Sequence, residues 1–153
     1  MGVDSSATSL AIARRVHATE RIAFRDVSDL ASLEPFDLVY VNGVFHHVPP
    51  AERAGVVAAI VRTTAPGGLV ALWENNPFNP GTRWVMKRLP FDRDAVLLTP
   101  GETRGLLGSG GLHVIETRFH FFFPRALAML RPAEPSLHRV PLGGQYVVLA
   151  RRP

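Results

Sequence analysis

Runs of consecutive apolar residues, each beside a proline or glycine turn, dominate the hydrophobic pattern of the chain. Residues 36–41 (FDLVYV) follow a proline, and residues 68–74 (GLVALWE) follow a Pro-Gly-Gly turn. Mainly apolar runs of this length are typical of strands that are buried on both faces of a parallel sheet. Residues 145–151 (QYVVLAR) predict a further strand close to the carboxyl end.

Segments with apolar residues at helical spacing alternate with these strands. Residues 51–64 predict a helix that ends at Pro66-Gly67-Gly68. Thr99 to Glu102 has the form of a capping box with proline at the first helical position, which predicts another helix start. Residues 6–18 predict an amphipathic helix through Leu10, Ile12, Ala13 and Val16.

The rest of the chain is less regular, but it completes the fold prediction. Residues 2–4 and 21–26 predict two short strands, and residues 114–123 a longer one. Residues 75–98 predict an irregular or partly helical insertion, and residues 124–144 a crossing segment with one helical turn. Strands that alternate with helices predict an α/β domain with a mainly parallel sheet. The last two strands have no full helix between them, which predicts an antiparallel finish at one edge.

Length and composition exclude several protein classes. The chain has 153 residues, 46% of them apolar and 20% charged, which is ordinary for one globular domain. It contains no cysteine, so disulfides, thiolate metal sites and cysteine nucleophiles are excluded. It has no apolar run near the roughly 18 residues of a membrane span. The first residues lack the layout of a signal peptide, so we expect a cytoplasmic protein.

The positive charge does not point to nucleic acid. The formal net charge is +4, and of the 17 basic residues only Lys87 is a lysine. Arginine, alanine, glycine and proline are all favoured by GC-rich codons, which accounts for the arginine bias. The arginines are scattered, whereas a nucleic-acid interface gathers basic residues into a stripe with aromatic residues between them. We therefore expect no nucleic-acid partner.

Five segments, taken in order, resemble the class I methyltransferases that use S-adenosylmethionine. Within that family the small-molecule enzymes are the nearest in pattern. The resemblance implies a Rossmann-like methyltransferase sheet, mostly parallel with an antiparallel last strand. The segments are GVDSSATSLAIARR (2–15), FRDVSDL (24–30), FDLVYVNGVFHHV (36–48), APGGLVALWEN (65–75) and QYVVLARRP (145–153).

One part of the family pattern has no counterpart in the chain. The family's first strand, its turn of the form E/D-x-G-x-G-x-G and its first helix would precede Gly2. The resemblance therefore implies an amino-terminally truncated methyltransferase domain over residues 1–153. The glycine turn lets the backbone approach the methionyl part of the cofactor, so we expect weak or absent cofactor binding by this chain alone. The second and third strands would also lack the neighbour that joins them to the fourth.

The resemblance assigns the nucleoside half of the cofactor to two strand ends. Asp4 would accept hydrogen bonds from the ribose hydroxyls, and Ser5 would lie along the adenine. Asp26 would accept from the exocyclic amine of adenine, with the backbone N–H of Val27 facing a ring nitrogen. Asp29 competes with Asp26 for this role.

The loop after the strand at residues 36–41 carries further candidates. The backbone of Asn42 and Gly43 would contact the methionyl part of the cofactor or the substrate, although Asn-Gly is also a common plain turn. His47 is the candidate catalytic residue, acting as a general base, although a packing role for both His46 and His47 is the alternative. Neighbouring side chains on a strand or helix point in different directions, so we expect no metal site.

The segment that follows the fifth family strand is the candidate cover for the substrate. In the family, insertions at residues corresponding to 75–94 lie over the acceptor. Arg83, Lys87 and Arg88 would bind an anionic group of the acceptor if they do not simply face solvent. Aromatic residues that would line an apolar pocket, or else pack in the core, are Trp73, Phe78, Trp84, Phe91 and Phe121 to Phe123.

These features predict methyl transfer from S-adenosylmethionine to a small-molecule or lipid-like acceptor, impaired in a truncated chain. The sulfonium donor is already activated, so the protein must mainly align the nucleophile and exclude water. One alternative is a non-catalytic remnant or an interaction module that pairs its open sheet edges with a partner. An NAD-dependent Rossmann oxidoreductase is disfavoured, because it too needs a glycine turn. The acceptor and the oligomeric state stay open.

Overall fold

The computed structural model describes residues 1–153, which form two compact units. The first unit is Met1–Pro35 and the second is Phe36–Pro153. Each unit has a sheet of its own, with two strands in the first and four in the second. The single domain expected over residues 1–153 therefore stays a prediction. No helix is long and apolar enough to cross a lipid bilayer.

The first unit is a short parallel strand pair with one helix between the strands. Strands β1 (Gly2–Asp4) and β2 (Phe24–Asp26) pair residue for residue along their whole length. Helix α1 (Ala7–His17) begins at Ser6, whose side chain caps it by accepting a hydrogen bond from the backbone N–H of Ser9. The single-turn helix η1 (Val27–Ser32) follows β2. These elements match the predicted order, with the second strand displaced toward Asp26.

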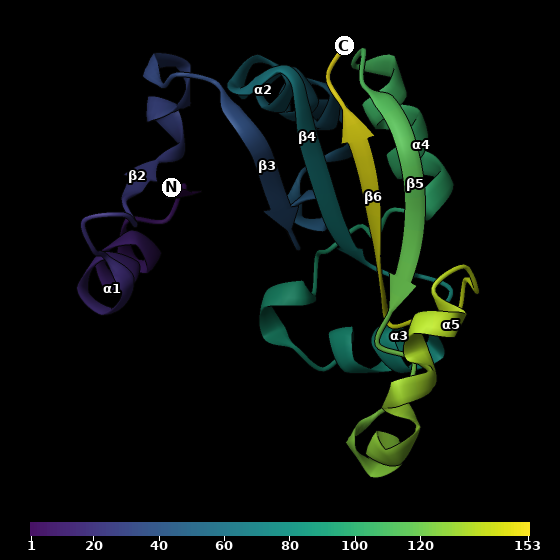
Figure 1. Ribbon diagram of the computed structural model, residues 1–153. Helices are drawn as coiled ribbons and strands as arrows, with labels where there is room; N and C mark the ends of the chain where they lie inside the picture. The colour runs from purple at the N-terminus through teal and green to yellow at the C-terminus, as the bar shows by residue number, and fades with distance from the viewer. The chain divides into compact units, whose positions relative to one another are not determined.

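The second unit is built on a four-stranded sheet in the order β3-β4-β6-β5 (Figure 1). Strands β3 and β4 are parallel, whereas β6 runs antiparallel to both of its neighbours, β4 and β5. Three strands thus share one direction and only β6 is reversed. This arrangement confirms the predicted Rossmann-like sheet with an antiparallel last strand. The strands are β3 (Phe36–Asn42), β4 (Thr64–Asn75), β5 (His113–His120) and β6 (Gln145–Arg151).

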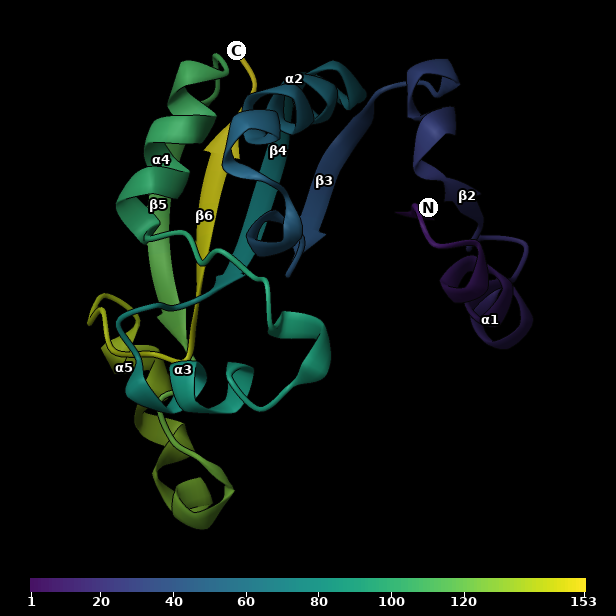
Figure 2. The same cartoon turned by 180° about the vertical axis from the view of Figure 1, so that it is seen from behind.

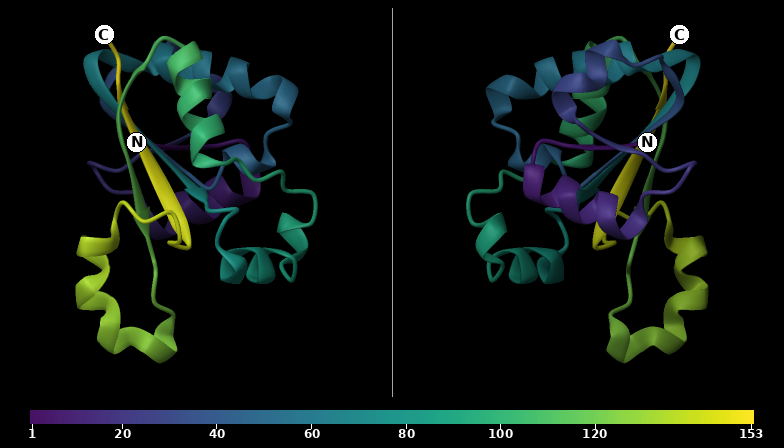
Figure 3. Two further views of the ribbon diagram at one scale, coloured as in Figure 1. Left: turned by 90° about the vertical axis from the view of Figure 1, so that its right-hand side faces the viewer. Right: turned by 90° about the vertical axis from the view of Figure 1, so that its left-hand side faces the viewer.

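Helices α2 (Arg53–Thr63) and α4 (Pro100–Ser109) cover the same face of this sheet (Figures 2 and 3). Helix α4 starts with the predicted capping box between Thr99 and Glu102. Smaller helical segments lie beyond the carboxyl ends of β3, β4 and β5 or connect the strands. They are η2 (Phe45–His47), η3 (Pro50–Glu52), α3 (Pro80–Met86), η4 (Pro90–Asp92), η5 (Arg125–Ala133) and α5 (Glu134–Leu137).

The core lies between the sheet and helices α2 and α4. Leu72 of β4, Leu107 of α4 and Tyr146 of β6 are completely buried there. Strand β3 contributes to this core on one face only, because Leu38 and Tyr40, which alternate with the inward residues, are more than half exposed. The prediction that residues 36–41 form a strand buried on both faces is therefore wrong. Within the second unit, helices α2 and α4 both lie on the sheet face opposite to Leu38 and Tyr40.

Candidate functional site

The parallel register of the first unit brings together two acidic residues that we predicted to bind the cofactor. Asp4 is the last residue of β1, Asp26 is the last residue of β2, and the two are direct partners in the ladder. Carboxyl ends of parallel strands are the usual ligand-binding edge of an open α/β sheet. The two carboxylates therefore stand side by side at the edge where a cofactor is expected.

Each of these carboxylates uses one oxygen to organise its own turn. Asp4 Oδ1 accepts from the backbone N–H of Ser6 at 2.7 Å. Asp26 Oδ1 accepts from the backbone N–H and the hydroxyl of Ser28, at 2.9 and 2.7 Å. The hydrogen bonds from Ser28 hold the pKa of Asp26 below its ordinary value, so this carboxylate stays ionised. The second oxygen of each carboxylate makes no hydrogen bond within the chain.

The other predicted cofactor residues divide between the two units. Ser5 and Val27 lie next to Asp4 and Asp26 in the first unit, and both are exposed. Asn42 and Gly43 lie in the second unit, where Asn42 is the last residue of β3. Gly43 has a φ of +65°, a conformation that favours glycine, and its backbone N–H donates to the carbonyl of Trp73 at 3.0 Å. This turn ends β3 and starts the histidine segment.

The histidine segment η2 is held by a completely buried glutamate from the end of β4. Glu74 Oε1 accepts from the backbone N–H of Phe45 at 2.7 Å, and its Oε2 lies 2.6 Å from Nδ1 of His46. A buried carboxylate is costly unless hydrogen bonds satisfy it, and these two contacts do so. Since an ionised carboxylate can only accept, Nδ1 of His46 carries the hydrogen. In the neutral imidazole with this tautomer, the opposite ring nitrogen, Nε2, bears the lone pair.

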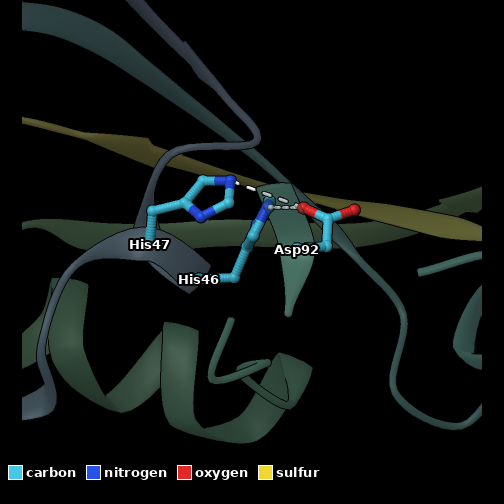
Figure 4. A group of neighbouring side chains, drawn as sticks. All are labelled: His46, His47 and Asp92. Carbon is cyan, nitrogen blue, oxygen red and sulfur yellow. Dashed lines mark ion pairs between the residues drawn. The ribbon is translucent and has the colours of Figure 1, made fainter. Parts of the chain in front are cut away.

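Both histidines direct their Nε2 atoms toward one buried aspartate (Figure 4). Asp92 Oδ1 lies 3.7 Å from Nε2 of His46 and 3.5 Å from Nε2 of His47. The two imidazole rings lie against each other, with centroids 4.2 Å apart. The expectation that adjacent histidines point apart is wrong here, because η2 is a tight single turn rather than a strand or an α-helix.

A cavity of about 660 Å³ adjoins this cluster in the second unit. Asp92 forms part of its wall, together with Asn75 at the end of β4. Arg88, a candidate for binding an anionic acceptor, places its guanidinium 3.6 Å from the ring centre of Trp84 and donates to the Trp84 carbonyl. The aromatic lining of the cavity is Trp84, Phe121, Phe122 and Phe123.

Sequence reasoning missed Glu74 and Asp92. Glu74 could have been found, since it stands in alternation with the buried Val70 and Leu72 of β4. An acid in phase with core residues needs a buried partner. Asp92 gave no such signal, because the segment around it has no regular hydrophobic period.

Comparison with known proteins agrees with the sheet topology. Residues 1–68 match the family model described as a methyltransferase domain. The matched segment contains both strands of the first unit and extends to the start of β4. No curated protein matches the chain with significant sequence similarity.

Solved methyltransferase structures share the fold at low sequence identity. One from Archaeoglobus fulgidus has a TM-score of 0.73 at 13% identity, over 99% of this chain and 75% of that protein. One from Thermotoga maritima, described as a possible histamine N-methyltransferase, has a TM-score of 0.72 at 18% identity, covering 99% and 72%. One from Mesorhizobium loti has a TM-score of 0.66 at 22% identity, covering 99% and 79%.

Proposed function

We propose that this protein transfers a methyl group from S-adenosylmethionine to a small-molecule or lipid-like acceptor. The observation that carries the proposal is the pairing of Asp4 with Asp26 at the carboxyl ends of parallel strands, within the segment that matches the methyltransferase domain. Two carboxylates at neighbouring strand ends suit a nucleoside, which offers ribose hydroxyls and an exocyclic amine as donors.

In this proposal each carboxylate uses its unpaired oxygen for the cofactor. Asp4 accepts from the ribose hydroxyls, with Ser5 along the adenine. Asp26 accepts from the adenine amine, with the backbone N–H of Val27 donating to a ring nitrogen. Asn42 and Gly43 contact the methionyl part through their backbone.

The cavity in the second unit is the proposed acceptor site. Its aromatic lining favours an acceptor with an apolar or aromatic body. His47 is half-exposed and is the proposed general base that takes a proton from the acceptor. The remaining task is alignment of the nucleophile with the donor methyl group, which needs no further catalytic group.

An interaction module is the second candidate, and the open edge of β3 favours it. Strand β3 pairs only with β4, so one of its edges offers free backbone groups. The exposed Leu38 and Tyr40 on the same strand would add apolar contact to a strand supplied by a partner.

A two-part experiment separates these candidates. The chain is produced both as residues 1–153 and with a family strand, Gly-rich turn and helix placed ahead of Met1. Both forms are incubated with S-adenosylmethionine and a panel of small acceptors, and mass spectrometry detects products that have gained one methyl group. We expect transfer by the extended form, abolished or strongly reduced by Asp26→Asn but retained by Asp29→Asn. A folded extended form that binds no S-adenosylhomocysteine would favour the interaction module.

A further inference from the structure

We propose that His46, His47 and Asp92 form a binding site for a divalent transition-metal ion, with zinc as the ion that fits best. This inference goes beyond methyl transfer and does not depend on it. All three residues lie in the second unit, and their ligand atoms lie within 4.8 Å of one another.

The electrostatics of the cluster call for a cation. Because Glu74 accepts from Nδ1 of His46, the neutral form of this ring presents the lone pair of Nε2 toward Asp92, as a metal ligand requires. Asp92 Oδ1 is buried and makes no hydrogen bond with any group of the chain. A buried carboxylate oxygen without a partner is costly, and a bound cation removes that cost.

The distances are close to those that a four-coordinate metal requires. Zinc binds imidazole nitrogen at about 2.0–2.1 Å and carboxylate oxygen at about 2.0–2.2 Å, so tetrahedral ligand atoms lie about 3.4 Å apart. Asp92 Oδ1 lies 3.7 and 3.5 Å from the two Nε2 atoms. All three ligand atoms lie within 4.8 Å of one another, so inward rotation of the side chains completes the site.

The surroundings have the form of a supported and accessible metal site. Glu74 accepts from the far ring nitrogen of His46, as carboxylates commonly do behind a metal-bound histidine. The side chain of His47 is 43% exposed, which gives an ion a route from solvent. Two histidines and one carboxylate leave the fourth position to water or to a ligand in the adjoining cavity.

Metal binding and general-base action by His47 use the same lone pair. The two roles therefore exclude each other at any one moment. We expect zinc to inhibit any transfer that depends on His47 as a base.

Zinc titration of the metal-free chain of residues 1–153 tests the proposal without any methylation assay. Calorimetry should show one ion bound per chain, and Co²⁺ should give the visible absorption of a four-coordinate ion. Glu74→Gln should weaken binding roughly 10–100-fold, and His47→Gln, which replaces an exposed side chain, at least as much. His113→Gln removes an exposed histidine outside the cluster and should change nothing.

Two results would overturn the proposal. One is the absence of zinc binding by a chain that circular dichroism shows to be folded. The other is binding that survives unchanged in His47→Gln and in Asp92→Asn, which would place the ion on other histidines.

Discussion

The two units differ in how much of the proposed nucleoside site and how much of the core they contain. The first, Met1–Pro35, holds the paired Asp4 and Asp26 but has only one buried residue, Leu10. The second, Phe36–Pro153, holds the continuous core of the protein. A unit smaller than about 40 residues without disulfides or metal rarely folds by itself. The proposed nucleoside site thus lies on the part of the chain with the least core.

Core truncation should give the largest difference between the units. Leu72→Ala removes a completely buried side chain from the inner strand β4 of the second unit and should lower its free energy of unfolding by about 2–5 kcal/mol. Leu10→Ala, the matched change in the first unit, should alter that same free energy by less than about 0.5 kcal/mol. Urea unfolding followed by tryptophan fluorescence reports on the second unit, because both tryptophans lie there. Equal losses in the two variants would show that the units unfold as one.

Helix caps offer a second comparison of intermediate size. Thr99→Ala breaks the capping box of α4 and should cost about 1 kcal/mol in the same urea experiment. Ser6→Ala removes the cap of α1 and should raise hydrogen exchange over residues 7–17 while the urea midpoint stays constant. A shift of the midpoint in Ser6→Ala would contradict the separation of the units.

Acid sensitivity should show the smallest difference. The hydrogen bonds from Thr99 hold the pKa of Glu102 below its ordinary value of 4.5. Glu102 therefore stabilises the second unit above that pH, and this contribution is lost as the pH falls through the lower folded value. Glu102→Gln should flatten the dependence of the urea midpoint on pH below 4.5. Asp26→Asn should not, although the pKa of Asp26 is also lowered, because Asp26 lies in the other unit.

The sequence was sufficient for elements whose local signals agree with their packing. Residues 6–18 became α1, and the predicted capping box at Thr99 and Glu102 is formed. The run at residues 36–41 became β3, but its apolar residues did not reveal that one face stays exposed. Burial depends on which elements cover a strand, and an apolar run within that strand does not contain this information.

The candidate site was only partly predictable for the same reason. Asp4 and Asp26 each end a strand, so their pairing follows from a parallel register. The cluster joins His46 and His47 of the single turn η2 with Asp92 of the irregular segment around η4, which lies far from them in sequence. Neither segment has a period from which side-chain direction could be inferred.

Calorimetric titration with S-adenosylhomocysteine tests the central claim, that the paired acids of the first unit bind the nucleoside of the cofactor. Residues 1–153 alone should bind weakly or not at all, and the form extended with a Gly-rich turn should bind in the micromolar range. In the extended form Asp4→Asn should weaken binding about 10–150-fold, the equivalent of losing hydrogen bonds to a charged group. Unchanged affinity in a folded Asp4→Asn protein, or no binding by the extended form, would contradict the account.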